Sequence, residues 1–144
     1  MNFLSKIKWP LAVITLFLSS IGVYDHLMTL TKNRSYFDSM GYSTTQIDYF
    51  TNYPLLLALF WTIGVWAMLI GSVLLPFKPK LSFYFYTSAS IGQAVLSIYT
   101  FAFKDRWHVL GNRLGTQDLL VLTLTILLSF YSLWLFRHSA KPKI

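Results

Sequence analysis

The chain has 144 residues, of which 55% are hydrophobic, 18% aromatic and only 12% charged. The mean hydropathy is +0.53. A water-soluble protein of this size has one small core, which cannot bury this much apolar surface, so the lipid bilayer is the expected solvent. The net charge of +7 does not indicate nucleic acid as a partner, because no basic cluster is interleaved with stacking aromatic residues. The absence of cysteine excludes disulfides, thiolate metal sites and thiol catalysis.

Four apolar runs predict four membrane-spanning helices, at residues 9–31, 53–75, 83–103 and 119–136. Each run is near or above the roughly 17 to 25 residues that a span needs. We therefore expect an all-α protein with a single transmembrane domain over residues 1–144, folded as a four-helix bundle in the membrane.

The first run has an alternative interpretation as a secretory signal. Lys6 and Lys8 precede an apolar core, and Ser20-Ile21-Gly22 resembles a small-x-small cleavage site. The helical pattern continues beyond this point, however. Cleavage would also leave three spans, with the lysines of the second loop on the wrong side of the membrane.

A short helix is predicted between the first two spans, at about residues 43–52. Ser43 and Gln46 have the spacing of a capping box, and Ile47, Phe50 and Tyr53 then recur every three residues. This helix is expected to lie on the outer surface with its apolar side down, before Pro54 begins the second span. It serves as an interfacial anchor or, alternatively, as a lid over the end of the bundle.

Each predicted span carries a face of small and hydroxyl-bearing residues. They are Thr15, Ser19, Gly22, His26, Thr29 and Asn33 in the first span; Gly64, Ala67 and Gly71 in the second; Ser90, Gln93, Ser97, Thr100 and Lys104 in the third; and Asp118, Thr125, Ser129 and Ser132 in the fourth. Such faces allow close helix packing, with interhelical hydrogen bonds worth about 0.6 kcal/mol each. Gly22, Gly64, Ala67 and Gly71 are the expected packing residues, and the alternative is that these faces line a pathway or pocket.

The basic residues divide into two sets at opposite ends of the predicted spans. One set has no acidic neighbour and consists of Lys6, Lys8, Lys78, Lys80, Arg137, Lys141 and Lys143. The other consists of Lys32, Arg34, Lys104, Arg106 and Arg113, on the side that also holds all five aspartates. Because the positive-inside rule places the more basic ends in the cytoplasm, both termini are expected to be cytoplasmic.

Asp25 and His26 carry most of the functional argument. At ~1.5 Å per helical residue, Asp25 lies about 24 Å beyond Trp9, inside a hydrocarbon layer ~30 Å thick. A charged residue at such a depth usually faces protein and finds a partner. We expect a cation of the 104–113 segment to pair with it.

Two interpretations of this aspartate stay open. It is either one half of a structural pair or part of a polar pocket at the outer end of the bundle. The residues predicted for that pocket are Asp25, His26, Gln93, Arg106 and Arg113.

No catalytic residue, metal site or cofactor is predicted. His26 and His108 lack the acidic and thiolate companions of a closed metal site, and Asp118 has the position of a first-turn residue in the fourth span. There is no Ser/His/Asp arrangement, phosphate-binding loop or carboxylate pair. The expected function is non-enzymatic, with a quinone- or haem-linked redox role as the alternative.

A resemblance adds to this interpretation. The segment Gly22-Val23-Tyr24-Asp25-His26-Leu27-Met28-Thr29 is followed by Tyr49-Phe50, Tyr53-Pro54, Trp61, Gly64-Val65-Trp66 and Gly71-Ser72. Over its first two spans the chain thus resembles a family of small four-span proteobacterial inner-membrane proteins of unknown function, often labelled "sugar transporter". The resemblance implies a bacterial inner (plasma) membrane location, although His26 stands where a Tyr or similar residue is expected. A looser analogy to DoxX-like proteins supports the four-helix bundle.

Two functions are therefore expected from the sequence. The first is a small-solute transporter or transporter subunit that uses the outer pocket; with four spans, it would form a homodimer through the face of Gly64, Ala67 and Gly71. The second is an accessory or assembly protein that binds another membrane protein through the same face.

Overall fold

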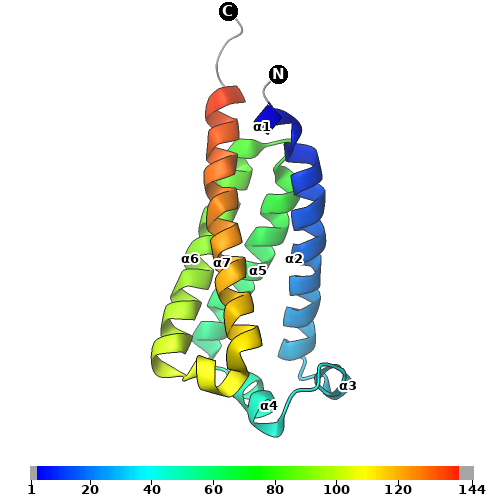
Figure 1. Cartoon of the computed structure of the whole chain (residues 1–144), viewed down its shortest axis with the longest axis vertical. Helices are drawn as coiled ribbons and strands as arrows, with labels where there is room; N and C mark the ends of the chain where they lie inside the picture. The colour runs from blue at the N-terminus through cyan, green and yellow to red at the C-terminus, as the bar shows by residue number, and fades with distance from the viewer. Residues whose placement is uncertain (1–2, 140–144) are drawn as a thin grey trace, which may run out of the picture.

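The described part of the chain, residues 3–139 of a computed structural model, consists of helices joined by short connections. Four are long and run side by side (Figure 1): α2 (Lys8–Leu30), α5 (Leu55–Leu74), α6 (Pro79–Phe103) and α7 (Arg106–Ser139). Three are short: α1 (Phe3–Lys6), α3 (Arg34–Ser39) and α4 (Thr44–Thr51). The predicted all-α class is confirmed.

Within residues 3–139, three helices are long and apolar enough to cross a membrane: α2, α5 and α7. Their outward-facing side chains are large and apolar, as Phe17, Leu55 and Leu120 illustrate with exposed fractions of 67%, 78% and 65%. Such surfaces are stable in lipid and not in water, so the chain is a multi-pass helical membrane protein. The helix expected as the third span, α6, is 25 residues long but is not among the three.

The helices pack in a simple order. α6 packs against both α5 and α7, and α2 packs mainly against α5. At one end, the Tyr131 hydroxyl donates a hydrogen bond to the Leu4 carbonyl at 2.6 Å, and Lys8 donates one to the Pro76 carbonyl at 3.2 Å. The connections that contain α3 and α4, and the connection from α6 to α7, lie at the opposite end (Figure 1).

The small-residue face of α5 lies against α6. A Cβ atom placed on Gly64 would lie 3.0 Å from Cγ of Gln93, and one on Gly71 would lie 3.1 Å from the ring of Tyr86. Ala67, between them, is also buried. The expectation that this face joins a second copy or another membrane protein is therefore corrected, because another helix of the same chain already covers it.

Hydroxyl groups connect the helices inside the bundle. The buried Tyr86 donates to Ser72 at 3.1 Å, and Ser82 donates to the Gly71 carbonyl at 2.8 Å, both joining α6 to α5. Thr87 and Ser129 join α6 to α7 at 2.6 Å. In lipid, where helices gain little from apolar burial, such bonds and close backbone packing hold a bundle together.

The predicted helix between the first two long helices is confirmed. Ser43 caps α4, since its hydroxyl accepts from the Gln46 N–H at 3.3 Å while its own N–H donates to the Gln46 side chain at 3.0 Å. The helix before it, α3, was not predicted. Its N-terminus is capped by Asn33, which accepts a hydrogen bond from the Tyr36 N–H at 2.9 Å.

Residues 104–118, which separate the third and fourth predicted spans, are largely helical and do not form a loop. Only Lys104 and Asp105 separate α6 from α7, which begins at Arg106 and continues through a kink at Gly111 (φ 76°, ψ 177°). Glycine suits this position because an L side chain rarely adopts a positive φ. Asp118 thus lies inside a helix and not in its first turn, so that interpretation is corrected as well.

A candidate binding cavity at one end of the bundle

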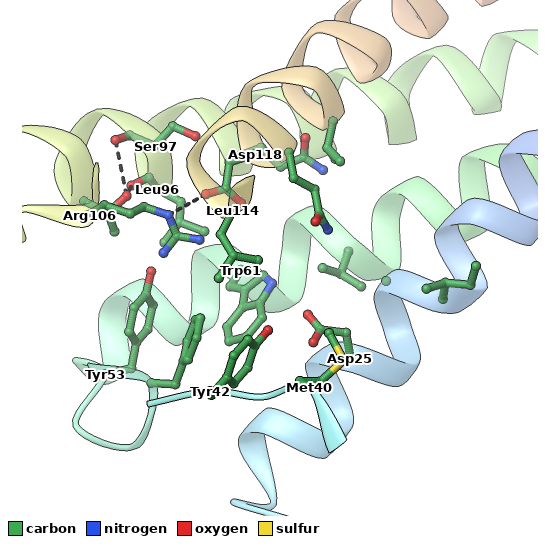
Figure 2. A pocket seen from close by; sticks show the side chains of 18 of the residues that line it. Asp25, Met40, Tyr42, Tyr53, Trp61, Leu96, Ser97, Arg106, Leu114 and Asp118 are labelled. Atoms are coloured by element: carbon green, nitrogen blue, oxygen red, sulfur yellow. Dashed lines mark hydrogen bonds and ion pairs between the residues drawn. The ribbon is translucent and has the colours of Figure 1, made fainter. Parts of the chain in front are cut away.

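A cavity of about 220 Å³ lies between the long helices at the end that carries α3 and α4 (Figure 2). All four long helices contribute side chains to it. Its polar lining includes Asp25 from α2, Gln93 from α6, and Arg106, Gln117 and Asp118 from α7. The structure thus brings three of the five predicted pocket residues, Asp25, Gln93 and Arg106, to one cavity.

Asp25 is partly buried, and its partner is a tyrosine. The Tyr36 hydroxyl, from α3, donates a hydrogen bond to Oδ1 of Asp25 at 2.5 Å. The ring of Tyr36 packs edge-on against Tyr24, with centroids 5.7 Å apart. The ion pairs found over residues 3–139 involve other groups, so the predicted pairing of Asp25 with a cation of the 104–113 segment is wrong.

The nearby cation, Arg106, pairs with a carboxylate of its own helix. Its Nε lies 2.5 Å from Oδ2 of Asp118, and only 9% of the residue is exposed. Its Cζ lies 5.9 Å from the ring centre of Tyr49. Among the described residues, Nη1 of Arg106 is buried with no hydrogen-bond partner, and so is the hydroxyl of Tyr49. An unsatisfied buried donor of a charged group is costly, and Nη1 is enclosed by protein atoms and not open to the cavity.

Gln93 forms part of the cavity wall from α6. Its Oε1 accepts a hydrogen bond from Thr125 of α7 at 3.1 Å. Thr125 also bonds to the Val121 carbonyl of its own helix at 2.7 Å. The amide of Gln93 is therefore held in place by the neighbouring helix, which leaves its nitrogen as the donor for other groups.

His26 is completely buried outside the cavity lining. The Thr62 hydroxyl gives its hydrogen to the Ala58 carbonyl at 2.7 Å and lies 3.1 Å from Nε2 of His26. The Thr62 oxygen therefore accepts a hydrogen bond from the N–H at Nε2 of His26. Nδ1 of His26 has no hydrogen-bond partner in the described chain. The ring centroids of His26 and Trp61 lie 4.7 Å apart in a T-shaped arrangement. Trp61 lines the cavity, so His26 supports the cavity wall but is not part of it.

Two other predicted residues, Arg113 and Gly22, do not have the roles expected of them. Arg113 is exposed and lines a separate surface hollow with Tyr42 and Gln46. Gly22, expected to allow helix packing, lines the main cavity, and a Cβ atom placed on it would meet no heavy atom within 4 Å.

Aromatic side chains form a large part of the cavity wall, and most of them were not predicted. They are Tyr36, Tyr42, Phe50, Tyr53 and Trp61. Phe50 and Tyr53 contact Trp61 with ring centroids 6.3 and 5.9 Å apart. Burial raises the pKa of Tyr42 and of Tyr53 above the usual phenol value, so both hydroxyls stay neutral near pH 7. The density of aromatic residues between positions 36 and 53 was the sequence signal for this wall.

The described residues contain no group of three or more His, Cys, Asp or Glu side chains that could hold a metal ion. His26 is buried within the bundle, whereas His108 is exposed and bonds to Asp105 at 2.6 Å. The cavity lining itself offers charged groups, hydrogen-bonding groups and aromatic faces.

Comparisons of the chain with protein-family models, with curated proteins and with solved structures find no match. The functional argument accordingly rests on the geometry of the cavity.

Proposed function

We propose that this protein is a four-span inner-membrane protein that binds a small polar solute in the cavity, as a transporter or as a subunit of one. The observation that carries the proposal is Arg106, a residue with 9% exposure that lines the cavity together with Asp25 and Gln93. Its Nη groups donate no hydrogen bond within residues 3–139. Ionisable side chains at membrane depth usually serve a site.

The fourth crossing in this proposal is α6. At ~1.5 Å per residue, its 25 residues extend about 37 Å, enough for a hydrocarbon layer ~30 Å thick. It packs between α5 and α7, which both qualify as spans by length and composition. A helix held between two spans is expected to share their depth.

Charge supports an orientation in which the cavity opens toward the outside. The end opposite the cavity carries basic residues without acidic ones: Lys6, Lys8, Lys78, Lys80 and Arg137, while Lys141 and Lys143 lie outside the described residues. By the positive-inside rule, that end is cytoplasmic in this proposal, and so are both termini. The resemblance of the first two spans favours a bacterial inner membrane.

An accessory role is the less favoured alternative. It relied on the face of Gly64, Ala67 and Gly71, which α6 covers. A solute-binding role uses a cavity that combines a buried guanidinium, a carboxyl group and an aromatic wall, and it needs no further surface.

Thermal unfolding of the purified protein in detergent tests solute binding. The probes are a sugar (glucose), a carboxylic acid (acetate), an amine (ethylamine) and an amino acid (L-alanine), each at 10 mM. A ligand at ten times its Kd stabilises the folded state by about 1.4 kcal/mol, so at least one probe is expected to raise Tm.

The matched variant is Gly22→Leu, which fills the cavity from a helix position where added atoms meet open space. It should abolish the shift in Tm, whereas Ser20→Leu, on the exposed side of the same helix, should keep it. No shift with any probe, or equal shifts in Gly22→Leu and the natural protein, would overturn the proposal.

A further inference from the structure

We propose that the ligand of the cavity is a compact zwitterion, whose anionic group binds Arg106 and whose cationic group binds Asp25. This inference rests on the solute-binding function proposed above and specifies its ligand class. It differs from the sugar that the family label suggests, because it follows from two opposite charges that the lining leaves incompletely paired.

The anion-binding end is Arg106. A guanidinium group carries five N–H donors, and in this chain Asp118 takes the one on Nε. Neither Nη group donates a hydrogen bond within residues 3–139, and Nη2, unlike Nη1, is not fully buried. A carboxylate or phosphate oxygen is the group that such donors bind most strongly.

The cation-binding end is Asp25. Its Oδ1 accepts from the neutral hydroxyl of Tyr36, its Oδ2 accepts no hydrogen bond from the described residues, and no described cation pairs with it. Tyr42 and Trp61 line the same cavity, and aromatic faces attract an ammonium group. An ammonium group would therefore find both a carboxylate and aromatic rings at this end.

The two ends are separated across the cavity. Figure 2 shows Asp25 and Arg106 on opposite sides, with Trp61 between them. The lining holds one more carboxyl group than guanidinium groups, because Asp118 lines it as well. A simple anion is thus disfavoured, a simple cation leaves the free donors of Arg106 unpaired, and a neutral sugar offers only dipoles to both ends. A molecule with two separated opposite charges satisfies both.

The size of the cavity limits the ligand. A volume of about 220 Å³ lies below the roughly 300 to 1,000 Å³ of pockets for drug-sized ligands. Amino acids and the phosphoethanolamine headgroup of a phospholipid are compact and share the required chemistry of an ammonium group and an anionic group. A dissolved zwitterion and a lipid headgroup are therefore the two sources of the same ligand chemistry.

The test measures Tm of the protein in nanodiscs of phosphatidylglycerol alone. L-Alanine and O-phosphoethanolamine are the zwitterionic probes, and ethylamine, acetate and glucose, at equal concentration, each lack one charge or both. We expect a zwitterion to raise Tm and the others to have at least tenfold weaker apparent affinity. Ethylamine lacks the anionic group, so its weaker binding tests the Arg106 end of the cavity without any change to the ion pair of Arg106 and Asp118.

The two sources are separated by changing the lipid. If the ligand is a headgroup, nanodiscs that contain phosphatidylethanolamine should raise Tm over phosphatidylglycerol alone, and dissolved L-alanine should add little. If it is a dissolved zwitterion, the Tm shift should depend on the added probe and not on the lipid. Either result supports the zwitterion. The dissolved-probe result also supports solute binding, whereas the headgroup result would replace the proposed solute with a lipid.

Variants test the Asp25 end. Asp25→Asn keeps an amide oxygen that accepts from Tyr36, so the local fold is expected to persist while zwitterion affinity falls at least tenfold. The control is Asp48→Asn, an exposed aspartate on α4 that does not line the cavity and should bind normally. If glucose stabilises the protein as strongly as the zwitterions, or if Asp25→Asn binds them normally, the inference is overturned while solute binding stands. If no probe and no lipid has an effect, both proposals fall.

Discussion

The hydroxyl of Tyr36 donates a hydrogen bond to the carboxyl group of Asp25, which joins α3 to the far end of α2. The bond closes a short stretch of chain, since the two residues are eleven positions apart. Both residues line the cavity, so this hydrogen bond fixes one wall of the site. It also fixes the position of α3 in the connection between α2 and α5.

Replacing Tyr36 by Phe should destabilise this end of the protein. The change removes the donor and leaves a partly buried carboxyl group without its hydrogen bond, at an expected cost of about 1 to 2 kcal/mol. Thermal unfolding in detergent measures the loss. Tyr24→Phe is the control, because the hydroxyl of Tyr24 forms no hydrogen bond within residues 3–139, and a fall in Tm as large as that of Tyr36→Phe would argue against the bond.

Removing the partner of Arg106 should cost more. In Asp118→Asn the guanidinium group stays buried without its carboxylate, and breaking a buried ion pair from one side costs about 3 kcal/mol. The exposed pair of Arg34 and Asp38, 4.0 Å apart, provides the comparison, since Asp38→Asn is expected to change stability by less than about 0.5 kcal/mol. Chemical denaturation of the two variants compares them directly, and equal effects would mean that burial of Arg106 contributes nothing.

Two glycines should respond in opposite directions to alanine. A Cβ atom on Gly92 would lie 3.0 Å from the Phe60 carbonyl oxygen and 3.4 Å from the Gly64 nitrogen, so α5 and α6 must separate, at about 1 to 3 kcal/mol. A Cβ atom on Gly22 meets open space, and Gly22→Ala should be neutral or gain up to about 1 kcal/mol from helix propensity. Tm values of both variants test this contrast, which fails if the two changes have the same sign and size.

The proposed orientation can be tested with single cysteines, because the chain contains none. Thr45→Cys places a thiol at the exposed start of α4, and Leu4→Cys places one on α1 at the opposite end. A membrane-impermeant maleimide should label the first variant in intact cells and the second only after the membrane is opened. The reverse pattern would invert the orientation, and labelling of both in intact cells would contradict two ends on opposite sides.

Much of the helical architecture could be predicted from apolar runs, because long stretches of apolar side chains have few alternatives to a helix in lipid. The capping box of Ser43 and Gln46 gave the position of α4. Two features were missed for a physical reason. The polar start of α7 resembles a loop in the sequence, because Arg106 and Asp118 form their ion pair only after the helix has formed. For α3, the only sequence signal is the capping residue Asn33.

The site was predictable as a set of residues and less so as a set of contacts. The polar residues Asp25, Gln93 and Arg106 stand out in apolar surroundings, and the structure places them around one cavity. Their partners depend on elements that converge from distant parts of the sequence. Asp25 bonds to Tyr36, from a helix that no apolar pattern indicates, and Arg106 turns to its own helix.

The contact between Tyr131 and Leu4 fastens the last long helix to the first short one at a single end of the bundle. In the proposed four-span arrangement, whichever way the protein is inserted, a fluorescent protein fused ahead of α1 and another fused behind α7 would emerge into the same compartment. Energy transfer between two such fusions would therefore be strong within one molecule, and it would report on the integrity of the whole bundle from a site remote from the cavity.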